Sequence, residues 1–182
     1  MSSKDMKKIV LLSRKSFLAK IQTHIAKIEI NKIKKNIIET HYSSSIGDKD
    51  LSAKAWEQHG FGIFTNSLSK KLVLKEADVV VHSFKDLPVK NLNKTSFVCL
   101  QRDDPRDIIL IKKSSLNKKK LVIGTSSPRR KYYLKKLKEF LPFKELKSIQ
   151  IRGHVQSRLE NVLNSSKEDG LFIAKAATDR IF

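Results

Sequence analysis

The stretch Val79–Val89 reads VVVHSFKDLPV and sets a run of β-branched residues directly before a polar cluster. An uninterrupted apolar run of this kind predicts a strand buried on both faces, as in a parallel sheet. Pro88 ends that strand, because proline cannot donate to a β-ladder. Lys85 and Asp86 therefore follow the carboxyl end of a buried strand, where open α/β sheets bind their ligands. A solvated turn explains the same polar residues equally well.

The chain as a whole is strongly basic. Its 182 residues include 38 Lys+Arg and 18 Asp+Glu, which gives a formal net charge of +20. Such a charge indicates an anionic partner, which could be nucleic acid, an anionic membrane or a polyanionic small molecule. A solvated, lysine-rich surface also accounts for much of it. The length suits one large domain or two small ones.

Cysteine usage and the N-terminus indicate the compartment. Cys99 is the only cysteine, which excludes a disulfide framework and a cysteine zinc site and is typical of a reducing compartment. No histidine pair has metal-ligand spacing, so no metal site is predicted. The apolar run Ile9–Leu12 is too short for a signal-peptide core or a membrane span. We therefore expect a soluble, cytoplasmic protein.

A helix is predicted after the first strand, Lys8–Leu12, with Ser13 as its expected N-cap. Apolar residues recur at helical spacing along it: Phe17, Leu18, Ile21, Ile25 and Ile28. Arg14 and Ser16 stand at this strand-to-helix junction, where free N–H groups and the helix dipole favour an anion. Capping and an exposed charge explain the same two residues.

A second strand is predicted at Asn36–His41 and a second helix at Ile63–Lys75. Between them, Ser43–Gly62 has few apolar anchors, which is typical of a lid, a binding loop or a disordered segment. Trp56 and Phe61 either dock such a lid or pin the loop to the core.

The second half of the chain repeats the strand–helix pattern. Strands are predicted at Phe97–Leu100, Ile108–Ile111, Leu121–Ile123, Ser148–Ile151 and Gly170–Ala174, and a further element begins at Ala176–Phe182. Pro105 sets a charged turn before the second of these strands. We expect the domain boundary near this turn.

The junction after Leu121–Ile123 carries the clearest anion-binding signal. Ser127 suits an N-cap and Pro128 the first position of a helix that continues to about Phe140. Arg129 and Arg130 then oppose the helix dipole in the first turn, which indicates a bound carboxylate or phosphate. Thr125 adds a hydroxyl donor.

A similar junction follows the next strand, where Arg152 precedes a helix that carries Arg158 one turn in. Its inward residues are expected to be Val155, Leu159, Val162 and Leu163.

Several of these segments together resemble the porphobilinogen deaminase family. They are VVVHSFKDLPV (79–89), RDDPRDIIL (102–110), IGTSSPRRKYYL (123–134), IRGHVQSRLE (151–160), LFIAKAATDRI (171–181) and, more weakly, LLSRKSFLAKIQ (11–22). The resemblance implies an α/β fold of two periplasmic-binding-protein-like domains, 1–101 and 102–182, with the active site in the cleft between them. It also implies that the second domain is incomplete and a third domain absent.

The family has hydroxymethylbilane synthase activity, in tetrapyrrole (porphyrin and heme) biosynthesis. Four porphobilinogen molecules condense with release of ammonia, on a dipyrromethane cofactor joined to a cysteine. Asp86 matches the catalytic aspartate, which stabilises a cationic azafulvenium intermediate and assists proton transfer. The other matching positions contact cofactor or substrate: Arg14, Ser16, Lys85, Thr125, Ser127, Arg129, Arg130, Arg152, Arg158 and Arg180. Arginine suits the two carboxylates of each porphobilinogen.

The chain also departs from the family pattern. Phe61 replaces a lysine, His154 an asparagine and Ala177 a glycine. The cofactor-bearing cysteine belongs to the third domain, which nothing here matches, and Cys99 is not its counterpart. We therefore expect a fragment, one half of a split protein or the product of a decayed gene, and we do not expect full activity from this chain alone.

The resemblance implies porphobilinogen as the small-molecule partner, a monomer, no nucleic acid and no membrane, with a separate C-terminal chain as a further candidate partner. Two other hypotheses stay open. One is a non-enzymatic anion-binding module on a periplasmic-binding-type fold. The other is a nucleic-acid-binding protein, which only the net charge suggests.

Overall fold

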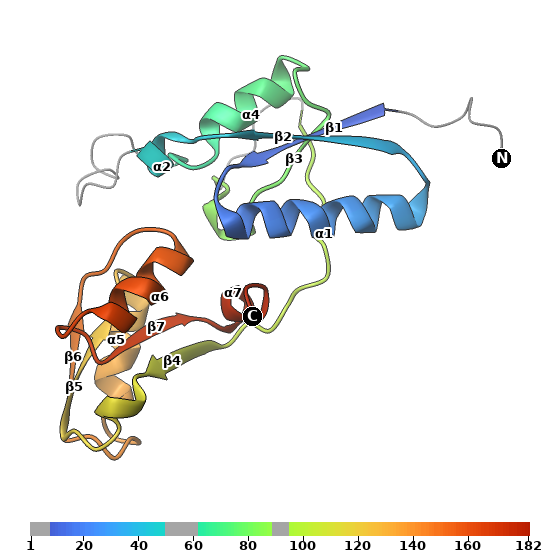
Figure 1. Ribbon diagram of the computed structural model, residues 1–182. Coiled ribbons are helices and arrows are strands. Elements are labelled where there is room, and N and C mark those ends of the chain that lie inside the picture. The colour runs from blue at the N-terminus through green and yellow to red at the C-terminus, as the bar shows by residue number, and fades with distance from the viewer. Residues whose placement is uncertain (1–7, 50–61, 89–94) are drawn as a thin grey trace. The chain divides into compact units, whose positions relative to one another are not determined.

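The computed structural model describes residues 8–49, 62–88 and 95–182, and the chain divides into two compact units. Unit 1 is Met1–Arg102 and unit 2 is Asp103–Phe182 (Figure 1). Each unit combines helices with a sheet that contains parallel strands, so the predicted α/β class is confirmed. Within the described ranges, no helix is both long enough and apolar enough to cross a membrane.

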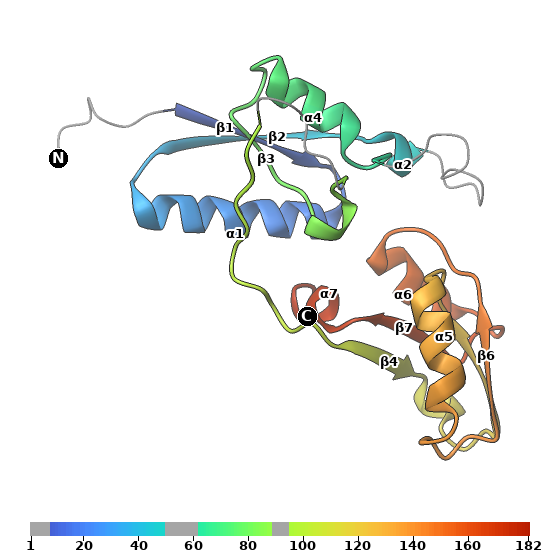
Figure 2. The same cartoon turned by 180° about the vertical axis from the view of Figure 1, so that it is seen from behind.

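Unit 1 is built on a three-stranded parallel sheet in the order β2-β1-β3. Its elements are β1 (Lys8–Arg14), α1 (Phe17–Ile33), β2 (Ile37–Ser43), α2 (Ile46–Lys49), α4 (Asn66–Val73), β3 (Val79–Val80) and a 3-10 helix, η2 (Phe84–Asp86). Figures 1 and 2 show α1 and α4 on opposite faces of this sheet. Strand β1 is the middle strand of this sheet, and helices cover both faces of the sheet. It therefore lies at the centre of the unit.

The core of unit 1 forms around β1. Leu11 and Leu12 are buried there, and Leu12 packs against Leu68 of α4 and Ala77. The carbonyl oxygen of Leu12 also accepts a hydrogen bond of 2.9 Å from the Val81 backbone N–H. These contacts hold the chain just past β3 against the end of β1.

Two strand predictions in unit 1 are wrong. The Val79 run does not form a strand buried on both faces: β3 is two residues long, lies at the edge of the sheet, and leaves Val79 36% exposed. The segment Phe97–Leu100 forms no strand, and its four side chains, Cys99 included, are exposed. An apolar run reports burial or β-propensity, but a strand also needs a neighbour to pair with.

The predicted N-cap of the first helix is also wrong. Ser13 is the sixth residue of β1 and is fully buried. Ser16 caps α1 instead, because its hydroxyl accepts a hydrogen bond of 3.4 Å from the Ala19 backbone N–H. The helical spacing is confirmed, although Phe17 and Ile28 face solvent rather than the core.

Unit 2 contains a four-stranded mixed sheet in the order β4-β7-β5-β6. Its elements are β4 (Asp107–Ile111), a 3-10 helix, η3 (Lys113–Ser115), β5 (Lys120–Gly124), α5 (Pro128–Leu137), β6 (Glu145–Ile149), α6 (Val155–Asn164), β7 (Gly170–Ala174) and α7 (Lys175–Asp179). Strand β4 is antiparallel to β7, whereas the β5–β6 and β5–β7 pairs are parallel. The first residue of β4, Asp107, is therefore opposite Ala174, the last residue of β7.

The core of unit 2 contains Leu121 and Ile123 of β5, Leu134 of α5, Phe143 and Phe172. Gly170 lies where three strands meet, and a Cβ atom there would come within 2.3 Å of the Leu110 carbonyl oxygen. Glycine is therefore the residue that this close strand approach requires.

Most element predictions for unit 2 are confirmed, including β7 at both ends. The predicted inward position of Leu163 is wrong, because this side chain is exposed at the end of α6. Helix α5 ends at Leu137 rather than near Phe140.

The predicted lid in unit 1 is only partly described. Its first part contains the short helix α2, whereas Trp56 and Phe61 lie outside the described residues.

Candidate functional site

A pocket in unit 1 lies where the chain leaves β1 and β3. It is lined by Arg14, Ala19, Gln22, Phe64, Thr65, Val81, His82, Ser83 and Asp86. Arg14 is the last residue of β1, and Asp86 ends the short helix η2 that follows β3. The parallel strands thus bring a predicted anion-binding residue and the predicted catalytic residue to the same edge of the sheet, where α/β proteins bind ligands.

Asp86 is a half-buried carboxyl group in this pocket. Burial raises its pKa above the ordinary value for aspartate, and the positive charges of Lys85 and Arg14 only partly offset that rise. The backbone N–H of Asp86 donates to the Ser83 carbonyl at 2.9 Å, which fixes the turn. A carboxyl group with a raised pKa in a pocket is typical of an acid–base residue.

Arg14 forms an ion pair with Asp48 of α2. Its Nε donates to both carboxylate oxygens of Asp48, at 3.1 and 3.0 Å, and its Nη2 contacts Oδ1. The two side chains are only 19% and 11% exposed. The guanidinium carbon also lies 4.4 Å from the centre of the Phe64 ring, within cation–π range.

Asp48 is held from its other side as well. Its Oδ2 accepts hydrogen bonds from the backbone N–H and the hydroxyl of Ser45, at 2.9 and 2.7 Å. Although burial opposes ionisation, the bonds from Arg14 and Ser45 lower the Asp48 pKa to about 2. This carboxylate is therefore ionised at neutral pH and balances the charge of Arg14.

His82 is half-buried in the same pocket. Its Nε2 lies 3.4 Å from the Ser69 hydroxyl. Burial, helped by the positive charge of Arg14, lowers the His82 pKa to about 4. The imidazole is therefore neutral at pH 7, beside a carboxyl group whose pKa is raised.

The neutral state of His82 can be tested by NMR. We expect the ¹⁵N shifts of its ring to stay unchanged from pH 8 to about pH 5 and to titrate near pH 4. Replacing Arg14 with glutamine should raise the midpoint, because it removes a repelling charge. A midpoint above 6 in the unaltered protein would contradict the proposed burial of the ring.

Two further predicted residues of unit 1 lie at its edge rather than on the pocket lining. Ser16 caps α1, and the exposed Lys85 acts on Asp86 through its charge.

The second group of predicted residues lies in unit 2, at the start of α5. Ser127 is the N-cap, and its hydroxyl accepts a hydrogen bond of 3.4 Å from the Arg130 backbone N–H. Pro128 begins the helix, as predicted. Thr125 is buried, and its Oγ1 accepts a hydrogen bond of 3.3 Å from the Ser127 backbone N–H. The loop after β5 is thereby fixed, with two arginines in the first turn of the helix.

Arg129 and Arg130 share the carboxylate of Asp107. Oδ1 of Asp107 accepts from Nε and Nη2 of Arg130, at 3.1 and 2.8 Å, and Oδ2 lies 2.5 Å from Nη2 of Arg129. Despite burial, these contacts hold the Asp107 pKa below its ordinary value. The Arg130 guanidinium also lies 5.9 Å from the centre of the Phe172 ring.

Arg158 adds a further positive charge to this group. Its Nε is buried and, within the described part of the chain, has no hydrogen-bond partner. Burial and the nearby charge of Arg130 lower the Arg158 pKa. Arg158 therefore adds positive charge near the ion pair that Arg130 forms with Asp107.

The last two predicted arginines also belong to unit 2, and Ile151, directly before Arg152, accepts a hydrogen bond from the Ser126 hydroxyl in the loop that precedes α5. Arg152 is half-buried just beyond β6, whereas Arg180 follows α7 and forms an ion pair with Asp103.

Sequence reasoning misses four residues of these sites: Asp48, His82, Gln22 and Asp107. His82 belongs to the segment VVVHSFKDLPV (79–89), and its position directly after the apolar run is a signal that could have identified it as a site residue. Gln22 hydrogen-bonds Ser83 at 3.2 and 3.3 Å across 61 residues of sequence, and no local pattern reports such a pair.

Comparison with known proteins identifies a family that this chain matches. Residues 9–182 match the family model described as "Porphobilinogen deaminase, dipyromethane cofactor binding domain". Dipyrromethane is therefore the cofactor of the matching family.

Three curated relatives have similar names. A porphobilinogen deaminase of Ruminiclostridium cellulolyticum is 35% identical over 97% of this chain and 59% of its own length. A probable porphobilinogen deaminase of Picrophilus torridus is 38% identical, over 93% and 58%. A porphobilinogen deaminase of Parasynechococcus marenigrum is 32% identical, over 94% and 55%.

The chain thus spans between 55% and 59% of the length of these relatives. The family model covers it from β1 to its last residue, including every segment that carries the resemblance. The chain belongs to the porphobilinogen deaminase family.

Proposed function

We propose that this chain supplies the acid–base and anion-binding groups of a hydroxymethylbilane synthase. That enzyme condenses four porphobilinogen molecules into the linear tetrapyrrole hydroxymethylbilane and releases ammonia at each step. The observation that carries the proposal is Asp86, whose half-buried carboxyl group has a raised pKa and shares a pocket with Arg14. The family membership supplies the reaction.

Asp86 is suited to a reaction that passes through a cation. Its carboxylate can stabilise a positive charge that develops on a pyrrole and can accept a proton from it. A group with a raised pKa exchanges protons closer to neutral pH than an ordinary aspartate does. The neutral ring of His82 adds no competing positive charge to the pocket.

The arginines are suited to hold the acidic side chains of the substrate. A guanidinium binds a carboxylate through two parallel hydrogen bonds and keeps its charge at every relevant pH. Arg158, on α6, carries a buried Nε that an anionic oxygen would satisfy, and Arg129, in the first turn of α5, has a side chain that is 59% exposed. Both residues therefore have N–H groups that could donate hydrogen bonds to a carboxylate.

The same donors fit the dipyrromethane cofactor, because its acidic side chains need several cationic partners. When bound, that group supplies the primer to which substrate units are added. Arg129, Arg130 and Arg158 would hold its carboxylates, with Thr125 and Ser127 fixing the loop that carries the first two. Cys99 is exposed on an irregular segment, and we do not assign it as the attachment site.

The finer parts of the fold are likewise proposals. We infer that units 1 and 2 correspond to the two periplasmic-binding-protein-like domains of the family. A monomeric state, a cytoplasmic location and a separate C-terminal partner chain rest on the family resemblance and stay predictions.

The test is complementation with the part of a relative that this chain does not span. The chain would be co-produced with the remaining C-terminal segment of the Ruminiclostridium cellulolyticum relative, and porphobilinogen consumption would be followed. The relative's own two segments, produced in the same way, are the positive control. We expect turnover in the combined preparation.

Two results would speak against the proposal. If the control pair turns over porphobilinogen and the mixed pair neither binds nor consumes it, the enzymatic proposal is lost. Binding without turnover would instead favour the anion-binding module. Asp86 argues against that alternative, because a carboxylate in the pocket weakens a site whose only task is to bind anions.

A further inference from the structure

Asp107 occupies a position at which a ligand's carboxylate is expected. Because β4 runs antiparallel to β7, its first residue lies at the sheet edge where β5 and β7 end. The start of α5, which follows β5, lies at that same edge. A negative charge is thus built into the group of cations that the proposed function assigns to an anionic ligand.

Each carboxylate oxygen of Asp107 contacts a different arginine. Oδ1 accepts both hydrogen bonds from Arg130, and Oδ2 forms the ion pair with Nη2 of Arg129. Asp107 and Arg130 are 13% and 15% exposed, whereas Arg129 is 59% exposed. Arg130 is therefore fixed by the protein, and Arg129 is tethered at one nitrogen with its other donors open to solvent.

Arg158 differs from these two arginines. Its Nε has no hydrogen-bond partner among the described residues, and its guanidinium is close enough to Arg130 for the two charges to repel. One carboxylate cannot balance three guanidinium groups. The group therefore keeps an excess of positive charge, and both Arg129 and Arg158 have N–H groups that Asp107 does not accept from.

We propose that Asp107 is a positioning residue that makes this group selective for dicarboxylates over single carboxylates. It holds Arg129 and Arg130 as one rigid fork and cancels part of their charge, so that a lone carboxylate binds weakly. A ligand with two carboxylates gains by engaging Arg129 and Arg158 together. The identity of that ligand, an acidic pyrrole, rests on the proposed function, whereas the selectivity is a property of these side chains.

The test uses two small probes, acetate and glutarate, and the 182-residue chain. Dissociation constants would be measured at fixed low ionic strength from the ¹H–¹⁵N shifts of the Ser127 and Arg130 amides. For the unaltered chain we expect glutarate to bind more tightly than acetate. In Asp107→Asn we expect acetate to bind about tenfold more tightly, because a repelling charge a few ångströms away is removed. The preference for glutarate should shrink, since Arg129 and Arg130 are no longer held as one rigid fork.

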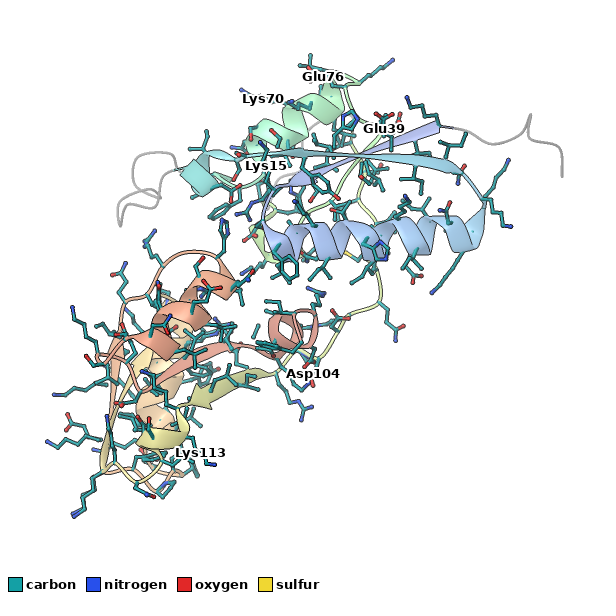
Figure 3. All side chains as sticks on the ribbon, viewed as in Figure 1. Lys15, Glu39, Lys70, Glu76, Asp104 and Lys113 are labelled. Atoms are coloured by element: carbon teal, nitrogen blue, oxygen red, sulfur yellow. The ribbon has the colours of Figure 1, made fainter. Side chains whose placement is uncertain are left out.

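The matched control is Asp104→Asn. Asp104 also pairs with an arginine, accepting from Nε of Arg106 at 2.9 and 3.0 Å, but it precedes β4 (Figure 3). This variant loses the same charge and should keep both dissociation constants. An Asp107→Asn chain that binds acetate no more tightly than the unaltered chain would overturn the inference.

A third variant covers loss of folding. Asp107→Glu keeps the charge but moves the carboxylate, so acetate affinity should stay within about twofold of that of the unaltered chain, while the preference for glutarate falls. If Asp107→Glu keeps the full preference for glutarate over acetate, the inference is overturned, even if Asp107→Asn does not fold. If the unaltered chain binds neither probe, the anion-binding part of the proposed function fails with it. If the unaltered chain binds both acetate and glutarate, and the two Asp107 variants bind them as the unaltered chain does, only this inference fails.

Discussion

Replacing Asp86 with asparagine in the complemented enzyme is expected to lower kcat by about a thousandfold, within the range for loss of an acid–base group. Asparagine keeps the shape of the side chain but can neither balance a cation nor accept a proton. KM for porphobilinogen should change little, because Arg14 and the arginines of unit 2 are retained. The measurement is steady-state porphobilinogen consumption with a single-turnover experiment beside it.

The control for this variant is Glu76→Gln, which removes one carboxylate just beyond α4 (Figure 3). It should leave kcat unchanged. Full turnover by Asp86→Asn would remove Asp86 from the mechanism, whereas an equal loss in both variants would point to a general effect of charge.

The pH dependence offers an independent check on Asp86. Because its pKa is raised, the carboxylate becomes protonated at a higher pH than an ordinary aspartate, and activity should fall as the pH decreases through that value. Lys85→Ala removes a charge that lowers the Asp86 pKa, so the acidic limb of the profile should move to higher pH. A limb that does not respond to Lys85→Ala belongs to another group.

The second large effect concerns stability. Asp48→Ala is expected to reduce the free energy of unfolding by about 3 kcal/mol, because it leaves the guanidinium of Arg14 buried without its counter-ion. Urea unfolding followed by circular dichroism measures this change. The matched control is Glu39→Ala, which removes an exposed carboxylate paired with Lys8 at 2.7 Å (Figure 3). An exposed pair contributes little, so the control should unfold as the unaltered chain does.

The same ion pair predicts the direction of acid sensitivity. The Asp48 pKa is about 2 in the folded protein, below its value in the unfolded chain, so the unfolded chain binds the proton more readily. The stabilisation, roughly 2 kcal/mol, is therefore fully present above about pH 5 and is lost as the pH falls towards 2. A difference between Asp48→Ala and the unaltered chain that stays constant down to pH 2 would contradict this account.

Local signals in the sequence explain why so much of unit 2 was predictable. Ser127 and Pro128 specify a helix start through their own backbone preferences, and the run Gly170–Ala174 is buried enough to read as a strand. The resemblance then assigns residues to the candidate sites, but those assignments stay predictions. What the structure adds is which of them share a pocket or a counter-ion.

The features that sequence reasoning missed depend on contacts between distant segments. The direction of β4 brings Asp107 to the arginines, yet the apolar run of this antiparallel strand (DIILI) is continuous, as is typical of a parallel one, so the sequence does not indicate its direction. Asp48 and Arg14 are 34 residues apart, and nothing in either neighbourhood indicates their pairing. The strand prediction for the VVV run (79–81) is wrong for a related reason. Its composition does not reveal that the run pairs with β1 on one side and over only two residues.

The short strand β3 has a consequence for how the chain behaves in solution. In the part of the chain that the structure describes, β3 ends the sheet, so its outer backbone groups are not paired within it. The exposed apolar side chains of Val79 and Phe84 lie on and just after this strand. An uncovered apolar edge is a template onto which another polypeptide can add a strand. Self-association of the chain would therefore grow with concentration whenever that edge is left bare.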